Sequence, residues 1–179
     1  MSDRARPKVV VRALSQFFSS RGGVRPSLIV IHSTESTNVK GPGDLAAIGA
    51  WFRNPAAQVS AHVCTDADGN SARYVRDSDK AWHCAAYNRV SLGIEQIGRA
   101  SQTSWTDAEI RETARWVARW SKLHGIPIRT GKVSGGSVVR SGVLRHSDLG
   151  SGGGNHNDPG SSYPIKRVLS LAKAYRKRI

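Results

Sequence analysis

The first cluster of hydrophobic positions is SLIVIHS, residues 27–33, a short uninterrupted apolar run rich in β-branched side chains. A run of this length without polar alternation predicts a buried central strand with little water on either face. His32 lies at the carboxyl end of this predicted strand. Further along, apolar residues recur at helical spacing after Asp44, which predicts a helix that Asp44 can cap. Its apolar positions are Leu45, Ile48, Trp51 and Phe52.

Two more strand predictions extend the sheet. Residues 60–77 contain two short strand-like runs on either side of Asp68-Gly69, a strong hairpin turn signal. Residues 90–97, VSLGIEQI, are a further buried strand pattern. If this strand runs beside the strand that ends at His32, Glu95 lies at the same edge of the sheet.

Two helices are predicted in the second half of the chain. Thr106 and Glu109 form a capping box, and the helix that they open runs to about Leu123, where Gly125 and Pro127 close it. Its predicted inward residues are Trp116, Val117, Trp120 and Leu123. Pro164 suits the first position of a last helix whose end is rich in Lys and Arg. Its apolar residues are Ile165, Val168, Leu169, Ala172 and Tyr175.

The remaining segments carry weaker patterns. Residues 1–26 are Arg-rich and contain Gly22-Gly23, which predicts an irregular or lightly structured lead-in. Residues 138–144 favour one short strand leading into His146, and the glycine-rich loop 148–160 is predicted to form no element of its own. We therefore expect an α/β fold, a mixed, mainly central β-sheet flanked by helices, with one domain in residues 27–179.

Charge points to an anionic partner. The 179 residues include 27 Lys and Arg against 13 Asp and Glu, a formal net charge of +14 that concentrates polyanions near the surface. Nucleic acid and bacterial cell wall, with its stem-peptide carboxylates and acidic polymers, both satisfy this electrostatic pattern. The sequence shows no helix-turn-helix pattern, zinc-finger spacing or RNP-like aromatic strand, so we do not expect nucleic acid.

The sequence shows no signal for export or membrane insertion. Arg12 interrupts Val9–Val11 before the core of a Sec signal peptide can form, and no segment approaches the roughly 20 apolar residues of a membrane helix. We therefore expect a protein made in the cytoplasm. Separately, we expect a monomer. Cys64 and Cys84 could form a disulfide, but two free buried thiols are favoured because nothing indicates an oxidising compartment.

Three residues suggest a metal site. His32 ends a buried strand, His146 opens the glycine-rich loop, and Asp158 lies near the far end of that loop. Imidazole and carboxylate groups bind zinc, and three protein ligands with an open fourth position make a catalytic site. Spacing alone leaves other interpretations open: His32 could bond to a backbone carbonyl, and Asp158 could only form an Asx turn before Pro159.

Several motifs occur together in a recognisable order. They are IVIHST at 29–34, SAH at 60–62, WH at 82–83, SLGIE at 91–95, RHSDLG at 145–150 and HNDPG at 156–160. In this combination the chain resembles the type-2 N-acetylmuramoyl-L-alanine amidase family, which also includes peptidoglycan recognition proteins. The similarity covers about residues 27–175. It implies hydrolysis of the amide bond between N-acetylmuramic acid and L-alanine in peptidoglycan.

The resemblance also implies roles for individual residues. His32, His146 and Asp158 would bind Zn²⁺, and no organic cofactor is needed. Glu95 matches the carboxylate that some members use as a general base; its alternative is an ion pair with an arginine. His156 stands where many members carry a lysine that supports the developing oxyanion. This is a departure, because a neutral histidine donates one hydrogen bond without a fixed charge.

The resemblance further places His62, Trp82, His83 and Asn88 along the substrate path. His62 could equally be structural, since its neighbours are apolar, and Ala61 stands where some members have a catalytic tyrosine, so that role does not transfer. Trp82 is the tryptophan expected to touch sugar or peptide. The helical spacing of three other tryptophans predicts core positions. They are Trp51, Trp116 and Trp120.

Three biological roles stay open on this basis. A basic single-domain chain without an export signal suits a phage or prophage lysin that reaches the wall after holin-type release. A cytosolic amidase that recycles released muropeptides is the second role. The third is a module that binds peptidoglycan without cutting it; members of that kind commonly lack a metal ligand, whereas all three ligand positions are filled here.

Overall fold

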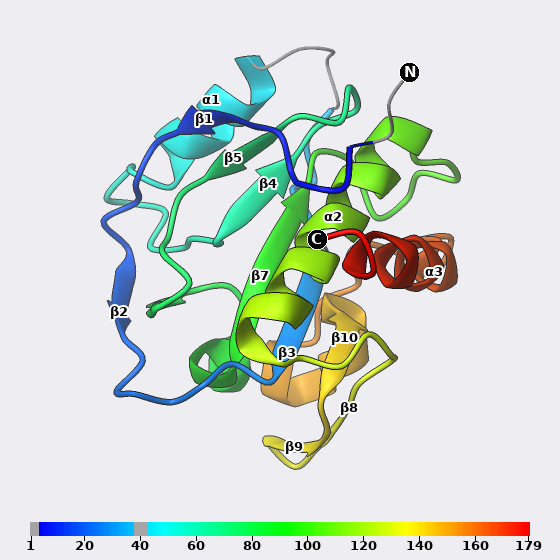
Figure 1. Cartoon of the computed structure of the whole chain (residues 1–179). Helices are drawn as coiled ribbons and strands as arrows, with labels where there is room; N and C mark the ends of the chain where they lie inside the picture. The colour runs from blue at the N-terminus through cyan, green and yellow to red at the C-terminus, as the bar shows by residue number, and fades with distance from the viewer. Residues whose placement is uncertain (1–3, 38–42) are drawn as a thin grey trace.

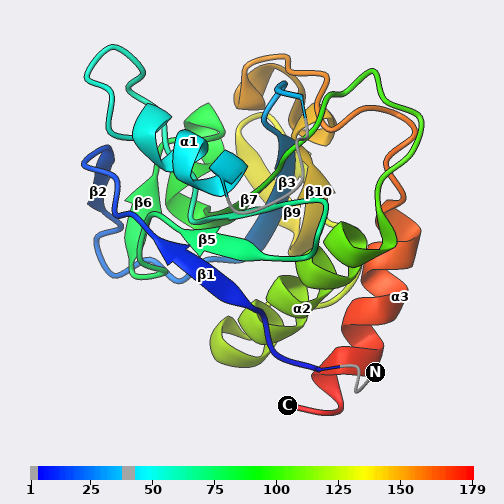
Figure 2. The same cartoon turned by 90° about the horizontal axis from the view of Figure 1, so that it is seen from above.

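The computed structural model describes residues 4–37 and 43–179 and contains a six-stranded mixed sheet with helices on both faces (Figures 1 and 2). In spatial order the strands are β1 (Val9–Arg12), β5 (Ser71–Arg73), β4 (Val63–Thr65), β7 (Ser91–Gln96), β3 (Leu28–Ser33) and β10 (Gly142–Arg145). Strands β4, β7, β3 and β10 run parallel, whereas β5 is antiparallel to β4. The predicted α/β class and mixed central sheet are confirmed.

The helices form the outer layers. Helices α2 (Asp107–His124) and α3 (Ile165–Arg176) cover one face of the sheet, and α1 (Gly43–Trp51) lies over the other, as Figure 2 shows. Two 3₁₀ helices, η1 (Ala85–Val90) and η2 (His146–Gly153), lie against the face of the sheet that carries His32. Two small antiparallel pairs complete the fold. They are β2 (Phe18–Ser20) with β6 (Asp79–Ala81), and β8 (Lys132–Ser134) with β9 (Ser137–Arg140).

The central strand β3 is buried along its whole length. Ile29 and Ile31 belong to the core cluster under α2 and α3, and Leu28 and Val30 belong to the cluster under the 3₁₀ helices. Because side chains alternate between the faces of a strand, His32 shares the second face with Leu28 and Val30. The predicted central buried strand is confirmed.

Strand register brings the candidate residues to one edge of the sheet. His32 pairs directly with Glu95 on β7, and Ile31 pairs with Arg145 on β10. His146, one residue beyond β10, therefore emerges beside His32. Since all three strands are parallel, their carboxyl ends meet at the same edge.

Helix α2 begins and ends where its sequence predicts, with the Thr106 half of the predicted capping box in place. The Thr106 hydroxyl oxygen accepts a hydrogen bond from the Glu109 amide at 3.2 Å, and Gly125 ends the helix with φ of 73°. Trp116 and Trp120 are buried, but Leu123 in the last turn is 54% exposed. Helical spacing predicts which side of a helix faces the core. It does not predict how many turns of the helix the core covers.

Three local predictions are corrected. Residues 4–26 are less irregular than predicted, because β1 joins the main sheet beside β5 and β2 pairs with β6. These pairings depend on partners about 60 residues away in sequence, which local patterns do not reveal. The single strand predicted for residues 138–144 is divided at Ser141 between β9 and β10, and the first half of loop 148–160 forms most of η2.

Candidate active site

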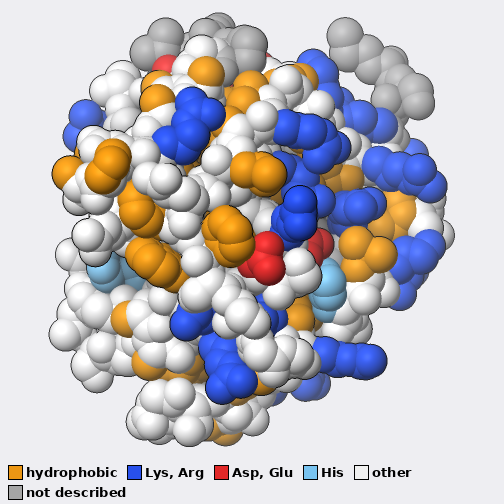
Figure 3. Space-filling model, turned by 90° about the vertical axis from the view of Figure 1, so that its left-hand side faces the viewer, with side chains coloured by type: hydrophobic (Ala, Val, Ile, Leu, Met, Phe, Trp, Pro, Cys, Tyr) orange, Lys and Arg blue, Asp and Glu red, His pale blue; other side chains and the backbone are white. Residues whose placement is uncertain are grey.

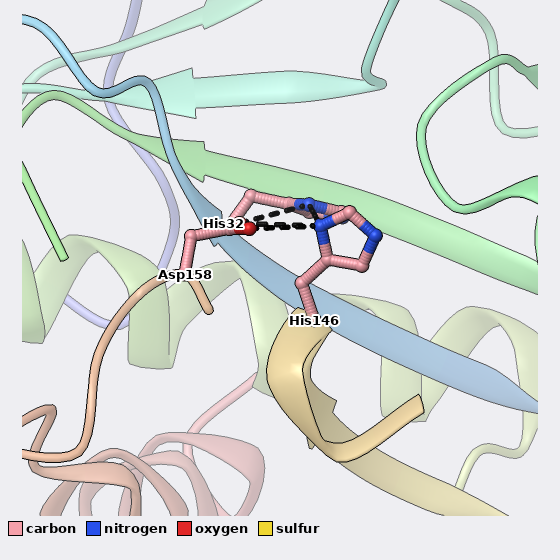
Figure 4. A group of neighbouring side chains, drawn as sticks. All are labelled: His32, His146 and Asp158. Atoms are coloured by element: carbon pink, nitrogen blue, oxygen red, sulfur yellow. Dashed lines mark hydrogen bonds and ion pairs between the residues drawn. The ribbon is translucent and has the colours of Figure 1, made fainter. Parts of the chain in front are cut away.

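Two imidazoles and one carboxylate converge at the carboxyl edge of the sheet (Figure 4). His32 Nδ1 lies 3.0 Å from His146 Nδ1, and Asp158 Oδ1 lies 3.0 Å from His146 Nδ1. Asp158 Oδ2 lies 3.4 Å from His32 Nδ1 and accepts a hydrogen bond from the Ser33 amide at 3.3 Å. The three residues come from the end of β3, the start of η2 and the loop after η2, and the structure brings them together as predicted.

The chemistry of these atoms fits a bound cation. His146 Nε2 lies 2.9 Å from the Gly153 carbonyl oxygen, which can only accept, so this nitrogen carries the proton and Nδ1 of a neutral ring presents a lone pair. The carboxylate of Asp158 is also an acceptor. Facing atoms 3.0–3.4 Å apart match the separation of about 3.3 Å between ligands of a tetrahedral zinc ion with bonds of about 2.0 Å.

The protonation states of the group also suit metal binding. Burial lowers the pKa of His32 to about 4, which keeps its ring neutral at pH 7. Burial alone raises the pKa of Asp158, but its close contacts with His146 and His32 outweigh burial and hold the pKa well below its ordinary value. Neutral imidazoles and an ionised carboxylate are the forms that bind metal ions.

Glu95 lies beside this group in the same cavity. Its Oε2 atom is buried and has no hydrogen-bond partner among the described residues. Burial, followed by the charges of Asp158 and Glu35, raises the pKa of Glu95 to about 8. A nearby cation favours the ionised form of a carboxylate, so metal binding would make Glu95 available as a base.

His156 stacks on one of the converging rings. Its ring lies parallel to that of His146, with centroids 4.1 Å apart and an interplanar angle of 16°. Its Nδ1 atom lies 3.6 Å from Asp158 Oδ1, and its side chain is 57% exposed. An exposed imidazole in the cavity lining can donate a hydrogen bond to a substrate oxygen, and the role of His156 stays a prediction.

A cavity of about 500 Å³ opens above these polar groups. One wall is apolar and comes largely from α1 and the loops that follow it. Its hydrophobic lining residues include Ile48, Trp51, Phe52, Val59 and Trp82. The prediction that Trp51 is a core residue is wrong, because its side chain is 50% exposed in this wall. Helical spacing identified the apolar stripe of α1, but the stripe continues beyond the core into the cavity.

The predicted substrate residues divide into two groups. Trp82 lines the cavity, and its indole N–H donates to Ser19 Oγ at 3.2 Å, which holds the ring in place. Asn88 also lines the cavity, but its Oδ1 accepts hydrogen bonds from the amides of His83 and Cys84 at 2.9 and 2.7 Å. Asn88 therefore shapes the loop that carries His83.

His62 and His83 have bonds within the protein. His62 is completely buried: its Nδ1 accepts from the Gly93 amide at 3.0 Å, and its Nε2 lies 3.1 Å from the Asp79 carbonyl oxygen. His62 is not among the residues that line the cavity, and these contacts suit its structural alternative; a substrate-binding role stays a prediction. His83 lines the cavity, but its Nδ1 lies 2.9 Å from His32 Nε2.

The two cysteines are buried and not joined in a disulfide. Burial raises the pKa of the Cys84 thiol to about 12 and that of Cys64 well above its ordinary value. Both are therefore thiols at neutral pH, in agreement with the favoured prediction.

Basic side chains are spread over the molecular surface. The face in Figure 3 shows many Lys and Arg side chains and few acidic ones, in keeping with the net charge of +14. In residues 4–37 and 43–179, the helices are all too short or too polar to span a bilayer.

Comparison with known proteins identifies the family. The sequence profile of the N-acetylmuramoyl-L-alanine amidase family matches residues 22–161. The chain is 30% identical over 152 residues to N-acetylmuramoyl-L-alanine amidase A of Achromobacter lyticus, which covers 81% of this chain and 82% of the relative. Because these matches span most of the chain, they support peptidoglycan amidase activity, a hydrolysis.

Solved structures show the same fold. The hydrolase AmiA of Staphylococcus aureus matches with a TM-score of 0.72 and 18% identity, covering 96% of this chain and 84% of its own. The amidase LysC of Clostridium intestinale matches with a TM-score of 0.66 and 16% identity, covering 93% of this chain and 98% of its own. With the family profile and the curated relative, these findings show that the chain belongs to the N-acetylmuramoyl-L-alanine amidase family.

Proposed function

We propose that this protein is a zinc-dependent N-acetylmuramoyl-L-alanine amidase that degrades bacterial cell wall as a phage or prophage lysin, with its catalytic domain in residues 27–179. The observation that carries the zinc proposal is the convergence of three metal-binding atoms, from His32, His146 and Asp158, within 4.8 Å of one another. Two neutral imidazoles and a carboxylate that leave one position open are the ligand set of catalytic zinc.

Glu95 would act as the general base and then as the general acid of the reaction. When bound, zinc supplies Lewis acidity, which polarises a carbonyl group and makes water acidic enough to lose a proton near pH 7. Glu95 takes a proton from the attacking water and delivers it to the amine of L-alanine as the amide bond breaks. Glu95 lines the cavity, and its Oε2 atom has no hydrogen-bond partner among the described residues, so the carboxylate is available for this transfer.

His156 and the apolar wall would orient the substrate. The exposed imidazole donates a hydrogen bond to the carbonyl oxygen as negative charge develops there, an interaction typically worth about 100- to 1,000-fold in rate. Trp51 and Trp82 present exposed or half-buried rings on the cavity wall, and aromatic faces suit the apolar faces of sugars.

Charge and substrate together support the lysin role. A net charge of +14 favours adsorption to a wall that carries carboxylates and acidic polymers. We propose that the protein is made in the cytoplasm and acts on the wall after holin-type release. A muropeptide-recycling amidase remains the alternative role for the same chemistry.

Product analysis tests the bond that is cut. Purified protein is incubated with intact sacculi and separately with small soluble muropeptides, and the products are identified by mass spectrometry. We expect solubilised sacculi and free stem peptides that begin with L-alanine. Fragments that keep the lactyl-alanine linkage would contradict amidase activity.

The same experiment separates the two roles, and a chelator tests the metal. Activity on small fragments without release from sacculi would favour recycling over lysis. Treatment with a strong zinc chelator should abolish product formation, and added zinc should restore it. Full activity after verified metal removal would contradict zinc dependence without contradicting the bond assignment.

A further inference from the structure

His83 lies between a metal-binding histidine and a buried serine. Its Nδ1 is 2.9 Å from His32 Nε2, and the two rings meet edge to face with centroids 5.0 Å apart. Its other nitrogen, Nε2, is 3.1 Å from Ser91 Oγ. The Ser91 hydroxyl in turn donates to the Tyr87 carbonyl oxygen at 2.8 Å. A continuous line of hydrogen bonds therefore runs from a backbone carbonyl to His32.

The chemistry of each partner sets the direction of these bonds. The Tyr87 carbonyl oxygen can only accept, so the single hydroxyl proton of Ser91 is committed to it. Ser91 Oγ then accepts from His83 Nε2–H, with a second lone pair left for the weak Cys84 thiol donor at 3.2 Å. With its proton on Nε2, a neutral His83 ring accepts at Nδ1, and His32 Nε2–H donates to it.

The outcome at His32 is a defined tautomer. Because Nε2 carries the proton, Nδ1 presents its lone pair, and this is the atom that faces His146 and Asp158. His146 reaches the same state independently, through its hydrogen bond to the Gly153 carbonyl oxygen. Both imidazoles therefore present Nδ1 to the metal position. The Nε2–H group of His32 donates to His83 Nδ1, and that of His146 donates to the Gly153 carbonyl oxygen.

Two further features fix the His83 ring. Gly93 lies directly beneath it on β7: a Cβ atom at this position would lie 2.7 Å from His83 Nδ1 and 2.9 Å from its Cγ and Cε1. The ring therefore needs a glycine in the SLGIE motif. The side-chain oxygen of Asn88 accepts from the His83 backbone amide at 2.9 Å, which holds the backbone of the loop.

We propose that His83 and Ser91 form a hydrogen-bonded relay that orients the His32 ring and fixes its metal-binding tautomer. In this proposal His83 is a positioning residue, not the substrate-binding residue that the sequence suggests. The inference rests on the proposed zinc site. Partners behind a metal ligand typically change metal affinity or activity by about 10- to 100-fold when they are removed.

Zinc affinity tests the relay directly. The full chain and four variants are titrated with zinc in competition with a chromophoric chelator: His83→Ala, His83→Asn, Ser91→Ala and Ser71→Ala. We expect His83→Ala and Ser91→Ala to weaken zinc binding by about 10- to 100-fold. His83→Asn should retain most of the affinity, because its Oδ1 stands where Nδ1 stood and still accepts from His32.

Ser71 provides the matched control. Like Ser91, it is the first residue of a strand and is completely buried, and its hydroxyl lies 2.9 Å from two acceptors, the Lys8 carbonyl oxygen and a Glu112 carboxylate oxygen. Loss of the Ser71 hydroxyl should leave zinc affinity unchanged. A fall in affinity as large for Ser71→Ala as for Ser91→Ala would assign the effect to general destabilisation and overturn the relay.

A second measurement separates positioning from substrate contact. At saturating zinc, a positioning role predicts that Ser91→Ala recovers most of its kcat with an unchanged KM. Unchanged zinc affinity in both Ser91→Ala and His83→Ala, with a raised KM in the latter, would overturn the relay and make His83 a substrate contact. If the unmodified chain binds no zinc, the proposed metal site fails first, and the relay fails with it.

Discussion

We expect the ionisation of Glu95 to lower the stability of the metal-free protein as pH rises. Burial and the charges of Asp158 and Glu35 raise its pKa from 4.5 to about 8. Between these pH values the folded protein holds a proton that the unfolded chain has released. This contribution is fully present below pH 4.5 and is lost as pH rises through about 8. The free energy of unfolding therefore falls with pH across this window.

One group can change the unfolding free energy by at most about 1.4 kcal/mol per pH unit. Between pH 5.5 and 7.5, Glu95 would lower it by up to roughly 3 kcal/mol, less if water entering the cavity stabilises the ionised carboxylate. Glu95→Gln removes this contribution. His32, whose pKa burial lowers to about 4, has the opposite dependence but is present in both proteins, so its contribution largely cancels in the comparison.

Urea unfolding of the two metal-free proteins at pH 5.5, 6.5 and 7.5, followed by tryptophan fluorescence, tests this reasoning. We expect Glu95→Gln to gain stability relative to the unmodified protein as pH rises, by about 1–3 kcal/mol over the range. Zinc should reduce the difference, because a nearby cation lowers the pKa of Glu95. Parallel pH profiles for the two metal-free proteins would refute the raised pKa.

Three further predictions concern the cavity, the core and the surface. His156→Ala should lower kcat by about 100- to 1,000-fold with little change in zinc content, as measured by steady-state kinetics and metal analysis. An unchanged kcat, or a loss of zinc, would contradict the role of His156. Trp51→Ala should raise KM and leave the unfolding free energy nearly unchanged, whereas Trp120→Ala, in a completely buried position, should cost about 3–5 kcal/mol in denaturant unfolding. Binding to sacculi should weaken by roughly tenfold or more between 0.05 and 0.5 M NaCl in a pull-down assay, and salt-independent binding would argue against electrostatic adsorption.

The sequence predicts the parts of the site that lie on regular strands. The apolar run before His32 identifies the central strand, and the strand pattern around Glu95 identifies its neighbour. Parallel strands end at one edge, so the proximity of His32 and Glu95 follows once the two are paired. The position of Asp158 does not follow from strand pairing, because this residue lies in a glycine-rich loop whose path local sequence patterns do not predict. Its position was predicted from resemblance to the family.

The failures have a common physical origin. Periodicity shows which side of an element is apolar, but it does not show what covers that side. Trp51 belongs to the apolar side of α1 and yet faces a cavity. His62 is buried, and its ring nitrogens lie near the Gly93 amide and the Asp79 carbonyl oxygen. The strand β1 is recognised only through its distant partner β5. The position of His83 behind His32 depends on Gly93, and short motifs do not show that contact.

Zinc stoichiometry tests the central claim most directly. Four proteins are dialysed against limiting zinc: the purified unmodified chain and the variants His32→Ala, His146→Ala and Asp158→Ala. Their zinc content per chain is measured by mass spectrometry, and circular dichroism verifies that each is folded. The convergence of the three side chains predicts one zinc ion per unmodified chain and nearly complete loss of zinc from each folded variant. Absence of zinc from the unmodified chain, or full zinc content in all three variants, would contradict the account.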